Sequence, residues 1–315
     1  MRLATLRDGT PDGRLVIVSP DGGRWAPAPV GTLQQLLEQW DEAVPACAAV
    51  TTFAEPLDPQ ALAAPLPRAW QWLDGSAFDS HGALMDQVFG ISPERTGLPL
   101  MYQGLSDRFY GPHDDVPLPD AALGIDFEGE FGVIVDAVPM GTSAAAALGH
   151  VRLVVQINDW SLRALAGPEM KTGFGWVQAK PACSMAGIAV TPEELGGQWR
   201  DGRVCLDLLV DWNGDRFGAP NGAAMAFGFH ELIAHAARTR ALPAGTIIGS
   251  GTVSNANFRE VGSTCIAERR GIEIVDEGAA RTGFMRFGDT VRMEARLADG
   301  RAPFGAIAQR VVQAG

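Results

Sequence analysis

The sequence is poor in cysteine, and its few cysteines show no pairing pattern. The 315 residues include four of them, at positions 47, 183, 205 and 265, and no two form a Cys-x-x-Cys motif. Isolated cysteines of this kind indicate neither a zinc site nor a disulfide framework. We therefore expect reduced and mostly buried thiols.

Positive charge is also scarce. The chain carries 25 Lys and Arg residues against 37 Asp and Glu residues, which gives a net charge of −12. A protein of this sign repels a phosphate backbone, so the composition argues against nucleic-acid binding.

Long apolar runs are missing as well. No segment approaches the roughly eighteen consecutive apolar residues that a membrane-spanning helix needs. The N-terminal MRLATLRDGTPDG lacks the apolar core of a signal peptide. We therefore expect a cytoplasmic protein that does not contact a membrane. Its hydrophobic content of 46% is ample for a substantial core.

The N-terminal part of the chain differs in pattern from the rest. Short apolar runs alternate there with Asp-Gly and Pro-Asp-Gly turns, which is typical of β-hairpins. A helix is predicted in GTLQQLLEQWDEA, where the apolar residues from Leu33 to Trp40 have helical spacing and Thr32 is a candidate N-cap. Several prolines between positions 56 and 67 then argue against regular structure. We predict a small β-rich domain with its linker at residues 1–68 and a larger domain at 69–315.

Beyond residue 68 the chain has mainly the pattern of strands. The clearest are FGVIVDAV, HVRLVVQIN, VCLDLLVDWNG, TIIGSG and DTVRMEARL, while FGFHELIAHAARTRAL has the pattern of one well-marked helix. The predicted fold class is therefore α+β, mainly β.

Three acidic residues interrupt apolar, strand-like stretches of this larger part. Glu128 and Glu130 lie in GIDFEGEFGVIVDAV, and Asp159 lies in VRLVVQINDWSLR. A carboxylate in a packed interior is costly unless a cation or hydrogen bonds meet it. Residues two apart on a strand point to the same face, so Glu128 and Glu130 can converge on one ion. Oxygen ligands alone suit Mg²⁺, Ca²⁺ or Mn²⁺ rather than zinc.

The same spacing has a simpler interpretation. Alternating polar positions are normal on a half-exposed strand, so both glutamates could lie on the solvent face of an edge strand, with Asp159 capping the end of another.

A further segment, WLDGSAFDSHGALMDQVFG, places Asp74 seven positions before His81 and ahead of a predicted helix. With this segment, the chain resembles the fumarylacetoacetate hydrolase family over the stretch from about residue 70 to the end. The family pattern has an aspartate and a histidine at this spacing, a Glu-x-Glu strand, an Asn-Asp-Trp-Ser-x-Arg segment and a later lysine. The sequence contains these elements in order as Asp74 and His81, Glu128 and Glu130, Asn158 to Arg163, and Lys180, followed by the family-like segments 250–254 and 287–291.

The resemblance implies a mixed β-roll catalytic domain that holds a divalent metal ion by carboxylates. It adds Asp74 as a fourth ligand to Glu128, Glu130 and Asp159. We expect Mg²⁺ in this site, with Ca²⁺ and Mn²⁺ as alternatives. The resemblance also implies a homodimer.

The activity implied by the resemblance is hydrolysis of a carbon–carbon bond in fumarylacetoacetate or a similar β-diketo or dioxo acid. Such a reaction belongs to the catabolism of aromatic compounds, tyrosine degradation included. The metal would serve as a Lewis acid, His81 as the general base that activates water, and Lys180 as the cation beside the developing negative charge.

Four further residues are candidate substrate contacts by resemblance or position. Tyr102 and Arg163 match family positions, Gln178 lies near Lys180, and Thr252 follows the glycines of GSGTVSN. Each has a structural alternative. A tyrosine at a strand end is commonly packed with its hydroxyl bonded, an arginine can pair with a nearby carboxylate and hold the Asp159 turn, and a Gly-rich segment can be a tight turn only.

Two departures from the family pattern bear on the substrate. The glutamate that partners the histidine in eukaryotic members aligns with Ile266, although Glu260 and Glu268 are near, and a family glutamine is replaced by Ala166. The alternatives to fumarylacetoacetate hydrolysis are therefore acylpyruvate hydrolysis, decarboxylation, isomerisation or hydration of a 2-oxo acid on the same fold, and a noncatalytic metal-binding protein.

Overall fold

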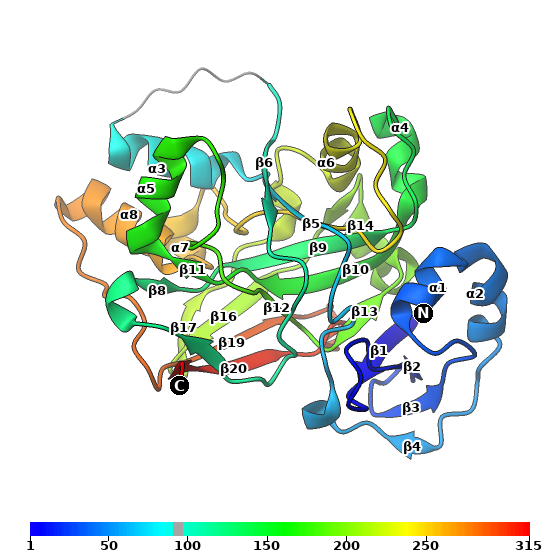
Figure 1. Cartoon of the computed structure of the whole chain (residues 1–315). Helices are drawn as coiled ribbons and strands as arrows, with labels where there is room; N and C mark the ends of the chain where they lie inside the picture. The colour runs from blue at the N-terminus through cyan, green and yellow to red at the C-terminus, as the bar shows by residue number, and fades with distance from the viewer. Residues whose placement is uncertain (91–96) are drawn as a thin grey trace.

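The fold is built on two β-sheets (Figure 1), and the computed structural model describes residues 1–90 and 97–315. The larger sheet has the strand order β4-β3-β2-β1-β13-β10-β9-β18-β5-β6, with β12 paired to β10. Its strands are β1 (Arg2–Leu6), β2 (Arg14–Val18), β3 (Arg24–Pro27), β4 (Glu55–Pro56), β5 (Trp72–Ser76), β6 (Leu100–Gly104), β9 (Gly129–Val135), β10 (Val151–Asn158), β12 (Ser184–Met185), β13 (Ile188–Val190) and β18 (Ile247–Gly249).

The smaller sheet has the order β17-β16-β19-β20-β7 and lies beside the central strands of the larger one. Its strands are β7 (Val116–Leu118), β16 (Leu208–Trp212), β17 (Asp215–Gly218), β19 (Thr290–Ala295) and β20 (Ile307–Gln313). Two short pairs complete the strands, β8 (Ile125–Asp126) with β11 (Ser161–Leu162), and β14 (Trp199–Arg200) with β15 (Arg203–Val204).

Helices lie around the sheets. The α-helices are α1 (Leu33–Glu38), α2 (Trp40–Ala48), α3 (Asp79–Phe89), α4 (Ala144–Ala147), α5 (Arg163–Thr172), α6 (Phe229–Ala236), α7 (Phe258–Val261) and α8 (Ile266–Glu277). The 3₁₀ turns are η1 (Pro59–Ala61), η2 (Ala121–Leu123), η3 (Leu148–His150), η4 (Pro192–Gln198) and η5 (Gly222–Ala224). No helix of the described ranges is long and apolar enough to cross a membrane.

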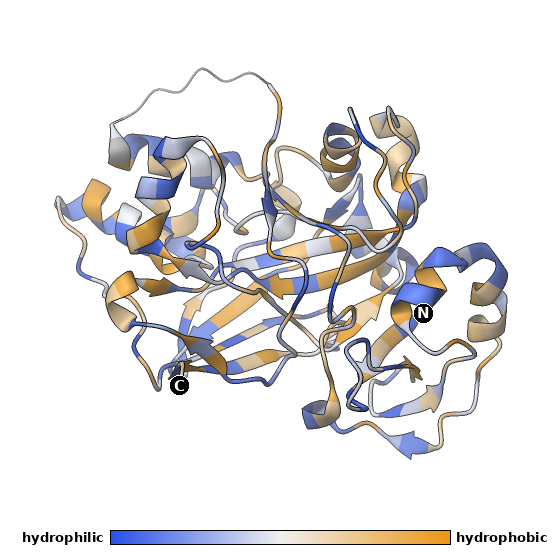
Figure 2. Cartoon of the chain, in the orientation of Figure 1, coloured by the Kyte–Doolittle hydropathy of each residue, from blue (hydrophilic) through white to orange (hydrophobic). Residues whose placement is uncertain are grey.

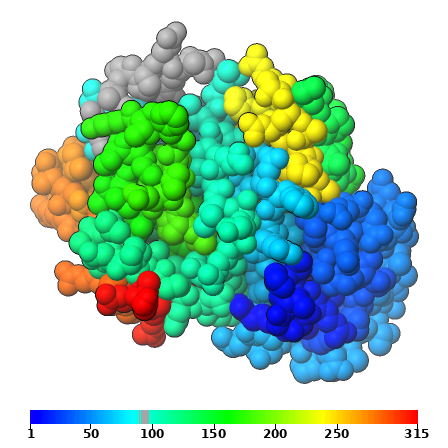
Figure 3. All heavy atoms as spheres, viewed as in Figure 1, coloured from blue at the N-terminus to red at the C-terminus, as the bar shows by residue number. Residues whose placement is uncertain are grey.

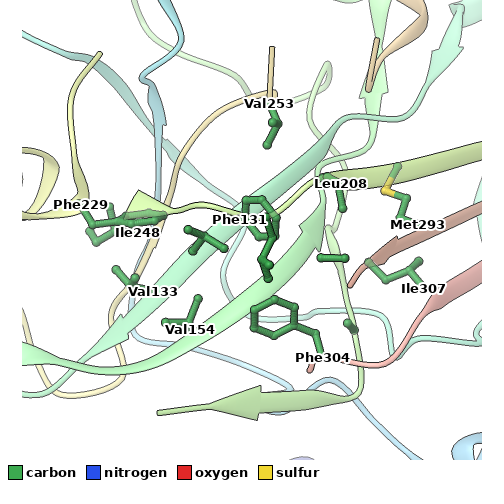
Figure 4. Close-up of a cluster of buried hydrophobic side chains, with 14 of the residues drawn as sticks. Phe131, Val133, Val154, Leu208, Phe229, Ile248, Val253, Met293, Phe304 and Ile307 are labelled. Carbon is green, nitrogen blue, oxygen red and sulfur yellow. The ribbon is translucent and has the colours of Figure 1, made fainter. Parts of the chain in front are cut away.

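Strand alternation divides the core into two clusters. Phe131 and Val133 of β9 pack with Leu208, Met293 and Ile307 of the smaller sheet (Figure 4). The intervening positions of β9 point to the opposite face, where a second cluster gathers residues of the N-terminal strands and α1. Figure 2 shows the resulting apolar character of β9 and β10. Both faces of the central strands are therefore buried, which confirms the mainly β, α+β fold class.

The N-terminal part does not form a sheet of its own. Its hairpin strands β1 to β3 are present as predicted, and β1 continues the larger sheet by pairing with β13, with Leu3 opposite Ala189. This part packs closely against the rest of the molecule (Figure 3). The domain boundary near residue 68 stays a prediction.

The helix prediction after Thr32 is correct at its start and wrong in its length. Thr32 is the N-cap and accepts a hydrogen bond from the backbone of Gln35. The helix ends at Glu38, because Gln39 has non-helical backbone angles, and α2 begins as a separate helix at Trp40.

Helix α8 was missed by the sequence analysis, and its position bears on the site. Gly271 in its middle weakens the helical pattern, since glycine disfavours a helix interior. A Cβ at Gly271 would lie 2.6 Å from Cε of Met85 on α3, so glycine permits the close packing of these two helices. This packing brings α8 next to the helix that carries His81.

Candidate metal centre and active site

Three buried carboxylates converge at one end of the larger sheet. Asp74 lies in β5, Glu130 in β9, and Asp159 directly after β10. One oxygen from each lies within 4.8 Å of the others, and all three side chains are buried. A divalent cation binds oxygen ligands at about 2.0–2.6 Å, which places two such ligands up to about 5 Å apart. The spacing therefore fits one ion between three carboxylates.

The absence of a side chain at one position makes this convergence possible. Gly249 of β18 is paired with Asp74 on one side and with Gly132 of β9 on the other. A Cβ at Gly249 would lie 2.3 Å from Oδ1 of Asp74. The carboxylate of Asp74 thus occupies the space above β18, and the backbone N–H of Gly251 holds it with a 3.0 Å hydrogen bond.

The electrostatics of the group call for a cation. Among the described residues, no N–H, hydroxyl or thiol group donates to either oxygen of Glu130, and its carboxyl group meets that of Asp74. Burial and the charges of Asp74 and Asp159 raise the pKa of Glu130 well above its ordinary value. Burial and Asp159 raise the pKa of Asp74 in the same way. A buried carboxylate without a donor is costly, and a bound divalent ion would remove that cost.

Glu128 has a different environment from the three-carboxylate group. Its oxygens accept hydrogen bonds from Lys180 at 2.9 Å, Thr252 at 2.7 Å and Ser161 at 2.7 Å. Nη2 of Arg163 lies 2.6 Å from Oε1 of Glu128. Burial would raise the pKa of Glu128, but the two cations outweigh it and hold the pKa well below its usual range. The two glutamates of the predicted pair therefore have different partners: Glu128 contacts the cations, and Glu130 belongs to the three-carboxylate group. A metal contact by Glu128 stays a prediction.

Lys180 connects these two environments. Its Nζ donates to Oε1 of Glu128 and, at 2.6 Å, to Oδ2 of Asp159. Burial alone would lower the pKa of Lys180, but the two carboxylates raise it above its ordinary value, so the ammonium group is charged. Tyr102 donates from its hydroxyl to the same oxygen of Asp159 at 2.6 Å. Cys183 donates from Sγ to the other oxygen.

His81 lies in the first turn of α3 and faces a buried glutamate. Its Nδ1 is 3.5 Å from Oε1 of Glu268 on α8. The family pattern placed the partner of His81 at Ile266. In the structure Glu268 faces His81 instead, because the register of α8 turns Glu268 toward α3. Ser254 donates to the same oxygen of Glu268, and Ser80 donates to Ser254 at 2.9 Å. The available signal in the sequence was that Glu268 lies only two positions beyond Ile266.

The remaining candidates lie around the group in different roles. Arg163 bonds Asp126 through Nε at 2.8 Å and also contacts Glu128. Thr252 bonds Glu128, while the backbone N–H of the exposed Gln178 donates to Glu169. Direct substrate contact by Tyr102, Arg163, Gln178 or Thr252 stays a prediction.

Two family models cover nearly the whole chain. Residues 71–312 match the C-terminal part of fumarylacetoacetate (FAA) hydrolase, and residues 1–68 match the fumarylacetoacetase N-terminal domain 2. The chain belongs to the fumarylacetoacetate hydrolase family. Membership confirms the resemblance inferred from the motif series.

Curated relatives match over part of their length. The 2,4-didehydro-3-deoxy-L-rhamnonate hydrolase of Sphingomonas sp. (strain SKA58) is 29% identical over 157 residues, which are 49% of this chain and 52% of the relative. A protein of Burkholderia cenocepacia (strain HI2424), named as a hydrolase, is 27% identical over 58% of this chain and 65% of its own. The chain thus matches about half to two thirds of the length of these curated relatives.

Solved structures match in fold over the full length of both chains. The maleylpyruvate hydrolase of Sphingobium sp. SYK-6, determined with manganese(II) and pyruvate, is 18% identical with a TM-score of 0.68 and 100% coverage of both chains. A probable 2-hydroxyhepta-2,4-diene-1,7-dioate isomerase of Mycobacterium abscessus is 20% identical with a TM-score of 0.69 and the same coverage. Identities this low show a shared fold.

Proposed function

We propose that the protein is a metal-dependent hydrolase that cleaves a carbon–carbon bond in fumarylacetoacetate or a similar β-diketo acid. The observation that carries the proposal is the buried carboxylate group, in which no N–H, hydroxyl or thiol group of the described residues donates to Glu130. A bound metal ion accounts for this group. The His81–Glu268 contact supplies the base that hydrolysis needs.

Asp74, Glu130 and Asp159 would hold the ion, with Glu128 as the further ligand that the family pattern implies. The donor set suits Mg²⁺, Ca²⁺ or Mn²⁺, of which we propose Mg²⁺; a structural neighbour is a manganese complex. A divalent ion bound there would supply a Lewis acid that polarises a 1,3-dicarbonyl substrate.

His81 is the proposed general base. Its Nδ1 lies 3.5 Å from the carboxylate of Glu268, so we place the proton of the neutral ring on Nδ1, which leaves Nε2 to accept a proton from water. The oxygen of that water forms the new bond to the carbonyl carbon, and the bond to the adjacent carbon breaks. The proton held by His81 is then transferred to the departing carbon, so that water is divided between the two products.

Lys180 is proposed to stabilise the negative charge that develops on the substrate oxygen. Its ammonium group is fixed by Glu128 and Asp159 and therefore needs no rearrangement during the reaction. Preorganised donors of this kind are effective because they do not have to be reoriented as charge develops.

Isomerisation of a related 2-oxo acid is the second candidate, since a probable isomerase shares the fold over its full length. The two reactions differ in their use of water. Hydrolysis in H₂¹⁸O places the heavy oxygen in one product, whereas isomerisation leaves the mass of the substrate unchanged. Decarboxylation would release CO₂, and hydration would add water without breaking the carbon skeleton.

The test uses wild-type protein and His81→Ala with Mg²⁺ and fumarylacetoacetate, followed by mass spectrometry for fumarate and acetoacetate. We expect metal-dependent release of both products by the wild type, and none by the variant, with metal affinity retained. If neither fumarylacetoacetate nor any acylpyruvate is cleaved by metal-loaded protein, the proposal is wrong. A noncatalytic metal-binding protein would show metal binding without turnover in both forms.

The proposal includes a homodimer in the cytoplasm that takes part in the catabolism of aromatic compounds, such as tyrosine. Family resemblance supports the dimer. Light scattering at working concentration tests it, and a monomer mass would contradict it.

A further inference from the structure

We propose that the substrate carries an apolar acyl group, which binds against an apolar rim formed by Leu100, Phe174, Trp176 and Val177. The reactive end would be the 1,3-dicarbonyl unit at the carboxylate group, and the rim would receive the other end. The inference rests on the proposed hydrolase function and narrows its substrate class to acylpyruvates with an alkyl or aryl acyl chain.

Exposed apolar side chains are concentrated at this place. The exposed fractions are 96% for Phe174, 83% for Val177 and 73% for Leu100. Of the nine large hydrophobic residues exposed in the described ranges, five fall in the two short segments 98–100 and 170–177. Single exposed apolar residues are normal on a protein surface, but a concentrated group marks a binding site.

The rim is continuous with the carboxylate group through Tyr102. Its hydroxyl bonds Asp159, and its ring contacts Trp176 edge-on with the ring centroids 6.1 Å apart. Leu100 precedes Tyr102 by two positions on β6, so both side chains point to the same face of the strand. On the other side, Lys180 follows Trp176 by four positions. Figure 3 shows the α5 segment and β6 next to each other at the surface.

Hydrogen bonds to Glu169 hold residues 177–179, which lie in the segment that carries most of the rim. The carboxylate of Glu169 on α5 accepts hydrogen bonds from three consecutive backbone N–H groups, those of Val177, Gln178 and Ala179, at 2.9–3.3 Å. The carbonyl of Ala179 accepts a further bond from Leu162 at 2.8 Å. Phe174 and Val177 are therefore exposed on a segment that hydrogen bonds hold in place at residues 177–179.

The charges near the site disfavour a second carboxylate on the substrate. Arg163 contacts the carboxylates of Asp126 and Glu128, and Lys180 contacts those of Glu128 and Asp159, so both cations are held at the carboxylate group, where the reactive end of the substrate would bind. The net charge of −12 also repels a dianion more than a monoanion.

The experiment compares kcat/KM for acetylpyruvate, hexanoylpyruvate, benzoylpyruvate, maleylpyruvate and fumarylacetoacetate in the Mg²⁺-loaded enzyme. Each buried methylene is worth up to about 0.8 kcal/mol, or about fourfold, so even partial burial of a hexanoyl chain raises kcat/KM about tenfold or more over acetylpyruvate. We expect hexanoyl- and benzoylpyruvate to exceed both dicarboxylates by a similar factor.

Two variants test the rim itself. The double variant Phe174→Ser/Val177→Ser should lower the hexanoyl-to-acetyl ratio of kcat/KM about tenfold, mainly through KM. Met140→Ser is the matched control, because Met140 is equally an exposed apolar residue but lies in a turn beside α6, where its substitution should leave the ratio unchanged.

The outcomes separate the two proposals. If none of the five compounds is cleaved, the proposed hydrolase function fails, and the substrate class fails with it. If cleavage occurs but acetylpyruvate or a dicarboxylate is preferred, only the apolar rim is wrong. If the double variant keeps the ratio but dissociates a dimer in sedimentation, a second copy of the chain covers the rim and the inference is overturned.

Discussion

Nδ1 of His81 lies 3.5 Å from Oε1 of Glu268, and this contact joins α3 to α8 at the candidate active site. Glu268 is fully buried and bonded by Ser254, so its carboxylate is held in place before any substrate arrives. A buried carboxylate that orients a histidine and balances its charge is the arrangement that a general base requires.

The first prediction concerns this contact. A general base is worth about 10²–10⁴-fold in rate, and Glu268 acts on it indirectly, so kcat should fall about 10- to 100-fold in Glu268→Gln. KM and the affinity for Mg²⁺ should stay the same, because Glu268 does not belong to the three-carboxylate group. Steady-state kinetics and calorimetry provide both numbers. Glu260→Gln is the control, since Glu260 is exposed and nearby in sequence. Equal losses of kcat in the two variants would contradict a positioning role for Glu268.

The second prediction separates the two glutamates of the Glu-x-Glu segment. No N–H, hydroxyl or thiol group of the described residues donates to Glu130, so Glu130→Gln should not destabilise the metal-free protein, and it should abolish most of the stabilisation by metal. That stabilisation amounts to about 2.7 kcal/mol when the ion is present at 100 times its Kd. Thermal unfolding with and without Mg²⁺ measures both effects.

Glu128→Gln should differ from Glu130→Gln in the metal-free protein. Glu128 neutralises Lys180 and Arg163 in the absence of any ion, so its replacement should cost on the order of 3 kcal/mol in metal-free protein. Equal unfolding temperatures of metal-free Glu128→Gln and Glu130→Gln would contradict the different roles assigned to the two glutamates.

The third prediction concerns the glycine above which Asp74 lies. In Gly249→Ala the new Cβ would meet both Oδ1 of Asp74 and the ring of Trp72 at 2.3 Å. Such overpacking costs about 1–3 kcal/mol, and displacement of Asp74 should also weaken metal binding. Chemical denaturation and metal titration measure the two losses. Gly149→Ala is the control, because nothing lies within 4 Å of its added Cβ, and a neutral effect in both variants would show that the strand adjusts.

The fourth prediction concerns the anchor of the apolar rim. Glu169→Gln removes a charged acceptor from three backbone N–H groups, so their hydrogen exchange at neutral pH should become faster. Exposed Glu193 offers the control variant Glu193→Gln. Mass spectrometry of the peptide that spans residues 174–180 measures these exchange rates. Unchanged protection in Glu169→Gln would mean that other contacts hold the segment.

The same anchor predicts a pH dependence. Hydrogen bonds from the backbone of Gln178 and Ala179 lower the pKa of Glu169 below its ordinary value of 4.5. A carboxylate with a lowered pKa in the folded state stabilises that state above its unfolded pKa, and the stabilisation is lost as the pH falls through the folded value. Protection of residues 177–179, corrected for intrinsic exchange, should therefore stay constant from neutral pH to 4.5 and decrease only below it. A decrease between pH 7 and 5 would contradict this assignment.

The sequence by itself determined the features that depend on local pattern. Alternating apolar residues identified β9, β10 and β19, Thr32 marked the start of α1, and the ordered motif series indicated both the family and the acidic group. Such features depend on residues within a few positions of one another, or on types that only a specific chemistry requires.

Only the tertiary structure decided which side chains meet. Glu128 and Glu130 have equivalent positions in a strand pattern, but Lys180 and Arg163 approach from other elements and neutralise just one of them. Glu268 became the partner of His81 because α8 packs on α3 through Gly271. Contacts of this kind join residues far apart in the chain, and hydrophobic periodicity carries no information about which distant elements will pack together.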